Sequence, residues 1–98
     1  MIPSMSARLI ARSKEIRDDE SIVEIVIWQL DEPLAPCQHP YKYRLFHGTA
    51  SQCRVRYDNE RGKGDHRHIG PSETAYDFDS LETLLDDFER DVTNWSTP

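Results

Sequence analysis

Residues 57–68, near the middle of the chain, concentrate side chains that can do chemistry. The segment is Tyr-Asp-Asn-Glu-Arg-Gly-Lys-Gly-Asp-His-Arg-His, with two histidines, three carboxylates and three basic side chains. Histidine moves protons near neutral pH, and Arg and Lys hold anions such as phosphate. This combination is typical of a site that acts on phosphate, while a charged and solvated loop without a function is the alternative.

The two histidines of this segment stand two residues apart, so on an extended chain both point to one side and Arg67 to the other. One hypothesis is metal-free RNA cleavage, in which one imidazole takes the proton of a ribose 2′ hydroxyl and a second acid protonates the leaving 5′ oxygen. The predicted catalytic residues are His66, His68, Glu60 and Asp58, and the predicted substrate-binding residues are Arg56, Arg61, Lys63, Arg67 and Tyr57.

A divalent metal is the other hypothesis for the same segment. His66 and His68 would bind it together with Asp58, Glu60 or Asp65. A single His-x-His is a weak ligand signature, because metal sites usually take three or four ligands from more than one segment. We therefore expect no cofactor and keep the metal as an alternative.

The charge is distributed unevenly along the chain. The formal net charge is −6, but residues 41–70 carry seven basic and three acidic side chains, whereas residues 71–98 carry one basic and eight acidic ones. Because binding of a nucleic acid depends on the local patch, the acidic average does not exclude an RNA substrate. It does argue against indiscriminate coating of DNA.

The elements that must position these residues are two hairpins and a helix. Runs rich in β-branched and alternating residues predict strands, and a stretch with three prolines predicts a surface loop. The expected order within a single domain, residues 1–98, is an N-terminal hairpin (8–30), a Pro-rich loop (31–40), a second hairpin (41–57), a polar site loop (58–68) and a C-terminal helix (79–95). A further short strand is expected around residues 75–78.

Alternation in the second hairpin separates two faces. One face collects Tyr41, Tyr43, Leu45, Cys53, Val55 and Tyr57, and the other collects Lys42, Arg44, Arg54 and Arg56. Like charges across a strand pair are unfavourable unless an anion covers them. Either the acidic C-terminal segment or an external phosphate would do so.

The C-terminal segment predicts an amphipathic helix. Asp79 and Glu82 have the spacing of a capping box, and apolar residues at helical intervals form one stripe: Leu81, Leu84, Leu85, Phe88, Val92 and Trp95. The expected fold is therefore α+β, a small twisted, mostly antiparallel sheet of four to five strands with the C-terminal helix packed on one face. Trp28 and Trp95 are expected in the core.

Composition excludes several classes of protein. The 98 residues suit one domain, the two cysteines do not form a disulfide framework, and no apolar run approaches the ~20 residues that cross a bilayer. The N-terminus lacks the features of a signal peptide, so a cytoplasmic protein is expected. Gly62-Lys-Gly64 lacks the spacing of a phosphate-binding P-loop, and no Ser or Cys hydrolase signature is present.

Four segments together resemble the TumE-type family of toxins from prokaryotic toxin–antitoxin operons. They are residues 22–28, 39–45, 56–68 and 87–91, and the resemblance covers roughly residues 8–92. It implies a toxin neutralised by a cognate antitoxin protein, with RNA as the expected target. A binding module without catalytic activity and a metal-dependent nuclease are the alternatives, and a homodimer is left open.

Overall fold

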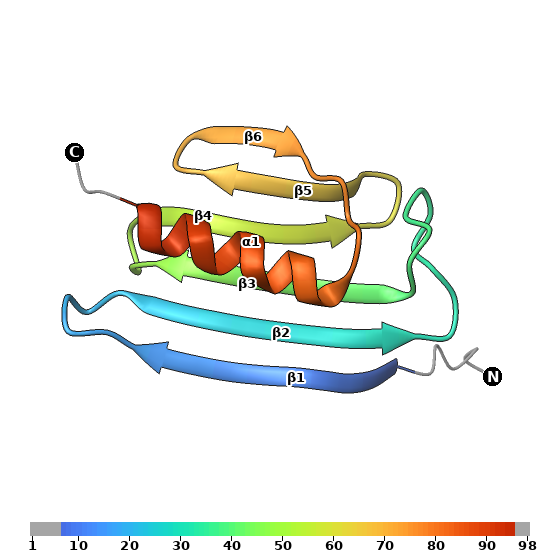
Figure 1. Ribbon diagram of the computed structural model, residues 1–98, viewed down its shortest axis with the longest axis horizontal. Helices are drawn as coiled ribbons and strands as arrows, with labels where there is room; N and C mark the ends of the chain where they lie inside the picture. The colour runs from blue at the N-terminus through green and yellow to red at the C-terminus, as the bar shows by residue number, and fades with distance from the viewer. Residues whose placement is uncertain (1–6, 96–98) are drawn as a thin grey trace.

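The computed structural model describes residues 7–95 as one antiparallel sheet with a helix packed against it (Figure 1). The strands lie in the sheet in the same order as in the chain, and each is paired antiparallel to the next. The elements are β1 (Ala7–Ile16), β2 (Ile22–Leu30), β3 (Tyr41–Gly48), β4 (Cys53–Glu60), β5 (Gly64–Ile69), β6 (Ser72–Ala75) and α1 (Leu81–Asn94). The α+β prediction with an antiparallel sheet and a C-terminal helix is confirmed, but the sheet has six strands and not four to five.

The extra strand comes from the polar segment, which is not a loop. Asp58, Asn59 and Glu60 continue β4, residues 61–63 form a tight turn, and β5 begins at Gly64. Gly62 and Gly64 both have positive φ, at 82° and 83°, which glycine adopts without steric cost. The prediction of a polar loop over residues 58–68 is therefore wrong. A further strand after this segment was expected at residues 75–78, but it lies at Ser72–Ala75.

Helix α1 begins one residue later than the capping box implied. The N-cap is Ser80, whose hydroxyl accepts a hydrogen bond from the Thr83 amide at 3.1 Å, and Asp79 precedes it. Serine is a strong N-cap because its side chain satisfies an amide that the first turn leaves free. The apolar stripe then faces the sheet, with Leu84, Phe88 and Val92 buried.

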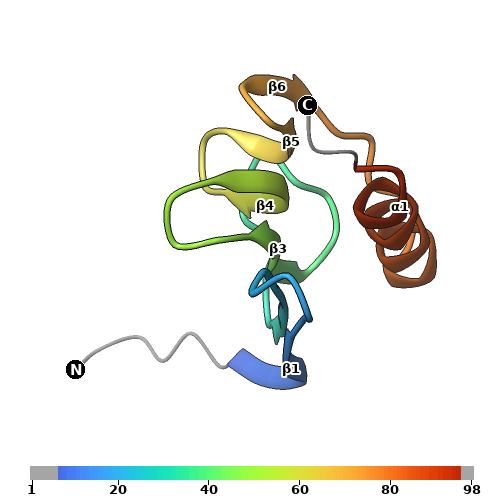
Figure 2. The same cartoon turned by 90° about the vertical axis from the view of Figure 1, so that its left-hand side faces the viewer.

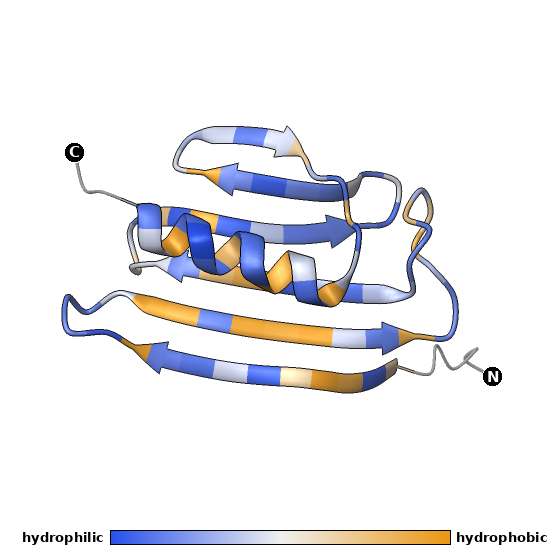
Figure 3. Ribbon diagram, viewed as in Figure 1, coloured by the Kyte–Doolittle hydropathy of each residue, from blue (hydrophilic) through white to orange (hydrophobic). Residues whose placement is uncertain are grey.

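The helix lies on only one face of the sheet, as the end-on view makes clear (Figure 2). Beneath it the core collects alternate residues of the strands with the helix stripe: Ile27, Tyr43, Leu45, Val55, Tyr57, Leu84, Phe88 and Val92. Orange bands recur along α1, and β2 is orange over much of its length (Figure 3). Within residues 7–95 the opposite face of the sheet carries no helix, and we call it the open face.

The open face is formed by the alternate residues of each strand that point away from α1. In the register of the sheet, Trp28 pairs with Lys42, Arg44 with Asp58, and Arg56 with His68. Arg54 does not belong to this row as expected, because the register shifts next to Gly48, and Arg54 instead makes an ion pair with Asp19. Among the described residues, no helix is long and apolar enough to span a membrane.

Candidate active site on the open face

Strands β4, β5 and β6 bring together five ionisable side chains on the open face. The register pairs Arg56 with His68, Asp58 with His66, and His68 with Glu73 across the next strand. We call Arg56, Asp58, His68 and Glu73 the His68 cluster. Its side chains are partly exposed, from 17% for His68 to 39% for Glu73, so a substrate can reach them.

One nitrogen of His68 lies between a cation and an anion. Nε2 is 2.9 Å from Nη2 of Arg56, 2.8 Å from Oε2 of Glu73 and 4.0 Å from Oδ1 of Asp58. A guanidinium only donates hydrogen bonds and an ionised carboxylate only accepts them. Without a proton, Nε2 therefore accepts from Arg56, and with a proton it donates to Glu73. Each protonation state has a partner in place, which is what a group that takes up and releases a proton requires.

The other members of the cluster hold this arrangement. Nε of Arg56 lies 3.3 Å from Oδ2 of Asp58, and the Lys63 ammonium lies 3.3 Å from Oε2 of Glu73. Desolvation opposes ionisation of Glu73, but the hydrogen bond and the charge of Lys63 outweigh it and lower the pKa of this carboxyl. Glu73 is therefore ionised at neutral pH.

His66 lies on the same face, as the two-residue spacing predicts, but both of its nitrogens are engaged or covered. Nε2 is 2.8 Å from the carbonyl oxygen of Lys63, which can only accept, so Nε2 carries the hydrogen. Nδ1 then holds the lone pair, and it is buried without a hydrogen-bond partner among residues 7–95. In this arrangement neither nitrogen is open to a substrate or to a metal, which weakens the His-x-His metal hypothesis.

Two predicted substrate-binding residues lie on the opposite face, under the helix. Tyr57 is fully buried, and its hydroxyl donates a short hydrogen bond to Asp91 of α1. Arg67 donates two hydrogen bonds of 2.8 Å to the same carboxylate. Burial and the Asp91 carboxylate raise the pKa of Tyr57, so it stays protonated. Both residues therefore connect the sheet to the helix and do not join the His68 cluster.

Two more predicted residues lie where β4 leads into β5: Glu60 is the last residue of β4, and Arg61 is the first residue of the turn. Both are exposed. Glu60 pairs with Gly64, four pairs beyond Arg56 and His68 along the strands. At ~3.3 Å per residue this places Glu60 roughly 13 Å from the His68 row. It is too far away to share one phosphate with His68.

Glu73 is the member of the cluster that the sequence interpretation missed. Gly70-Pro71, a dipeptide typical of turns, connects β5 to β6 as a two-residue hairpin link. Such a link places residue 68 opposite residue 73. The pairing of His68 with Glu73 could therefore have been predicted from the Gly-Pro turn in the sequence.

A second constellation, also unexpected from the sequence, lies under the Pro-rich loop. Asp65 accepts from Cys37 Sγ at 3.2 Å, from Nε2 of His39 at 2.8 Å and from the Tyr43 hydroxyl at 2.6 Å. The ligand atoms of Cys37, His39 and Asp65 lie within 4.8 Å of one another, a spacing that a metal could use. However, Nδ1 of His39 accepts a hydrogen bond from the Tyr41 amide, so Nε2 carries the hydrogen and has no lone pair for a metal.

This constellation is therefore a hydrogen-bonded network that fastens the loop to the sheet. Burial and the neighbouring Asp65 raise the pKa of the Cys37 thiol, which argues against a free nucleophile. The His39 ring also stacks on Phe78, with ring centroids 3.8 Å apart, which further fixes its position.

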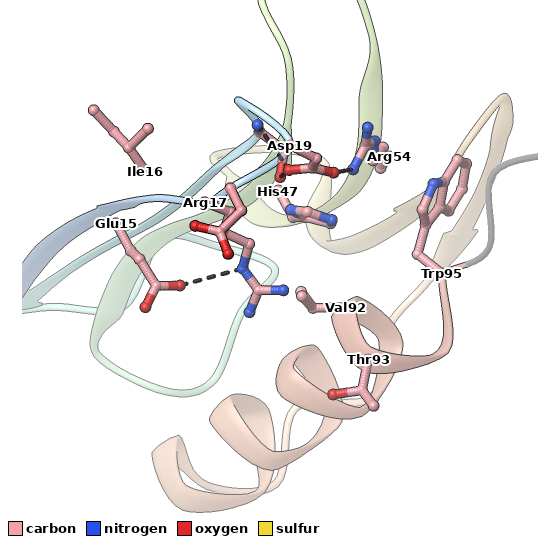
Figure 4. A pocket seen from close by; sticks show the side chains of 11 residues that line it. Glu15, Ile16, Arg17, Asp19, His47, Arg54, Val92, Thr93 and Trp95 are labelled. Carbon is pink, nitrogen blue, oxygen red and sulfur yellow. Dashed lines mark hydrogen bonds and ion pairs between the residues drawn. The ribbon is translucent and has the colours of Figure 1, made fainter.

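A cavity of about 760 Å³ lies where the β1–β2 turn meets the end of α1 (Figure 4). Two ion pairs line it, Arg17 with Glu15 and Arg54 with Asp19, and the hydrogen bonds that Asp19 accepts from Ser21 and Arg54 lower the pKa of Asp19. His47 is buried in its wall, and burial lowers the pKa of this imidazole, so it stays neutral. None of the predicted site residues lines this cavity.

Comparison with known proteins identifies the family of the chain. No curated protein and no solved structure matches it. A family model described as Toxin TumE matches residues 6–96, nearly the whole chain, which includes every strand, the His68 cluster and the helix. The chain belongs to the TumE toxin family, and it is accordingly the toxin of a toxin–antitoxin system with an antitoxin as its partner.

Proposed function

We propose that this toxin is a cytoplasmic ribonuclease that cleaves RNA without a metal, with His68 as the general base. The observation that carries the proposal is the position of His68 Nε2, between the Arg56 guanidinium at 2.9 Å and the Glu73 carboxylate at 2.8 Å. A base needs an accessible lone pair and a partner that stabilises the imidazolium. The lone pair of His68 Nε2 becomes free for the substrate when the Arg56 guanidinium turns to the phosphate, and Glu73 is the partner that stabilises the imidazolium.

The proposed reaction is an internal transesterification of the phosphodiester. The ribose 2′ oxygen attacks the phosphorus while His68 Nε2 takes its proton, and the bond from phosphorus to the 5′ oxygen breaks. Water protonates the leaving 5′ oxygen, and the products are a 2′,3′-cyclic phosphate and a 5′ hydroxyl. The imidazolium then donates to Glu73 in place of its earlier contact with Arg56.

Arg56 changes its role during this reaction. When the substrate binds, the guanidinium leaves Nε2 of His68 and donates to the phosphate oxygens, where negative charge develops. Lys63, with a side chain 49% exposed, adds a second positive charge next to the cluster. Asp58 keeps Arg56 oriented through its 3.3 Å contact with Nε.

We further infer that the antitoxin is a protein, as in type II systems, and that neutralisation requires it to keep RNA away from the open face. A toxin that only binds RNA or protein is the second candidate. It would depend on affinity and not on His68 chemistry, so the same variants separate the two functions.

The test is induced expression of the wild type and of His68→Gln, with His66→Gln as the matched control from the same face of the same strand. We expect growth arrest with new RNA fragments from the wild type, loss of both in His68→Gln, and retention of both in His66→Gln. Arrest that persists in a soluble His68→Gln protein would contradict the proposal and favour the binding module.

A further inference from the structure

Next to the His68 cluster, the open face carries three large apolar side chains that no core requires. Val26, Trp28 and Phe46 pair with Arg44, Lys42 and Glu24 across β2 and β3, so they share the open face with these polar residues. They are absent from the residues that pack against the core, and each is only partly buried. Trp28 was expected in the core from the sequence, and this assignment is wrong because its strand position faces away from α1.

Basic side chains surround these apolar residues. The Arg44 guanidinium lies over the Phe46 ring, 4.9 Å from its centroid, and its acidic contact is Glu24 at 3.2 Å. Arg12 pairs with Val26 and Lys14 with Glu24 across β1 and β2. Among residues 7–95, Arg12 and Lys14 make no salt bridge, and both are exposed. Arg12 and Lys14 therefore have no acidic partner among the described residues.

This patch continues directly into the His68 cluster. Phe46 pairs with Arg56, and Arg56 pairs with His68 on the next strand. Since neighbouring strands lie ~4.8 Å apart, Phe46 is roughly 10 Å from His68 across the sheet. One strand of nucleic acid can therefore contact the patch and the cluster at once.

We propose that Trp28, Phe46 and Arg44, with Arg12 and Lys14 at their border, form a stacking face that binds single-stranded RNA. This inference depends on the proposed function, since it assigns the substrate of the same site. Aromatic rings and an arginine plane stack on bases, and the lysine and arginine charges bind the phosphates. A duplex hides the faces of its bases, so it cannot use these rings. Most acidic side chains after residue 70 belong to α1, which lies on the other face of the sheet, and this favours binding of an anion here.

Binding is measured first with a fluorescent single-stranded RNA whose 2′ oxygens are methylated, because this RNA lacks the nucleophile and stays intact. We expect Trp28→Leu and Phe46→Leu each to weaken binding by at least about five-fold, the low end of the effect of removing one stacked ring. Arg44→Ala should weaken it as well. Trp95→Phe and Arg90→Ala are the matched controls away from this face, and they should bind like the wild type.

A second measurement does not depend on how the site variants fold. In Trp95→Phe, Trp28 is the single tryptophan, and RNA should quench its emission. In the wild type the same RNA should quench only part of the emission, because Trp95 follows the end of α1 and its ring lies beside Gly70, in the turn between β5 and β6, away from Trp28. Equal binding of a duplex, unchanged affinity in both aromatic variants, or emission of Trp28 that RNA leaves unaltered would overturn the stacking face.

Failure of the inference and failure of the proposed function give different results. Binding that depends on Trp28 and Phe46, together with unmodified RNA that stays uncleaved, would refute the ribonuclease and keep the stacking face. Cleavage that depends on His68 but is unaffected by Trp28→Leu and Phe46→Leu would keep the ribonuclease and refute the stacking face.

Discussion

Asp91→Asn should destabilise this protein strongly without touching the open face. The carboxylate is 8% exposed and accepts two 2.8 Å hydrogen bonds from Arg67 and one from Tyr57, so the change leaves a charged partner without its counter-ion. Breaking a buried ion pair costs ~3–5 kcal/mol. Because 35% of the Arg67 side chain is exposed, water compensates part of this loss, and we expect ~2–3 kcal/mol. That is a large share of the ~5–10 kcal/mol expected for a domain of this size.

The assay is urea unfolding of Asp91→Asn beside Asp86→Asn, an exposed position on the same helix. At neutral pH the first variant should unfold at a lower urea concentration, and the second should match the wild type. Burial opposes ionisation of Asp91, but the bonds from Arg67 and Tyr57 lower its pKa below the ordinary value of 3.8. Its contribution is therefore full above pH ~4 and is lost as the pH falls through the lowered pKa.

The pH dependence separates this ion pair from a general effect of the substitution. The stability gap between the wild type and Asp91→Asn should narrow as the pH falls below ~4, because the carboxylate of the wild type becomes protonated. A gap of less than ~0.5 kcal/mol at neutral pH would refute the account of how Arg67 and Tyr57 connect the sheet to the helix.

Three further predictions concern the helix, its packing and the metal. Ser80→Ala should lower the free energy of unfolding by ~1 kcal/mol in denaturant titration, since it removes the N-cap; no change would show that the cap contributes nothing. Phe88→Ala should lower it by ~3–5 kcal/mol, because this fully buried ring leaves a cavity between α1 and the sheet; a loss below ~1 kcal/mol would contradict the packing. EDTA should leave RNA cleavage by the purified toxin unchanged, and inhibition that Zn²⁺ or Mg²⁺ reverses would establish a metal.

Part of the fold follows from the sequence because local patterns determine it. Period-two alternation separates the buried Tyr43, Leu45 and Val55 from the basic row of β3 and β4, and the apolar stripe fixes the buried side of α1. The polar strand β5 carries no comparable signal. His66 and His68 face the open side and Arg67 faces the helix, so the strand has no apolar periodicity to mark it.

The site could not be predicted fully, because it is formed by contacts between residues far apart in the sequence. Arg67 has the character of a phosphate ligand, but its partner Asp91 lies 24 residues further along the chain, on an element whose placement the sequence does not give. The difference between His66 and His68 is also tertiary. It arises because Nε2 of His66 reaches the carbonyl of Lys63 in the preceding turn, while Nε2 of His68 lies between Arg56 and Glu73.

The most direct test of the proposed chemistry is the identity of the RNA ends that the purified toxin produces in EDTA. Wild type and His66→Gln should generate 2′,3′-cyclic phosphate and 5′-hydroxyl ends, and His68→Gln should be slower by about 10²–10⁴-fold, the usual contribution of a general base. Ends that carry a 5′ phosphate, or cleavage by His68→Gln at the rate of the wild type, would contradict His68 as the base of a metal-free ribonuclease.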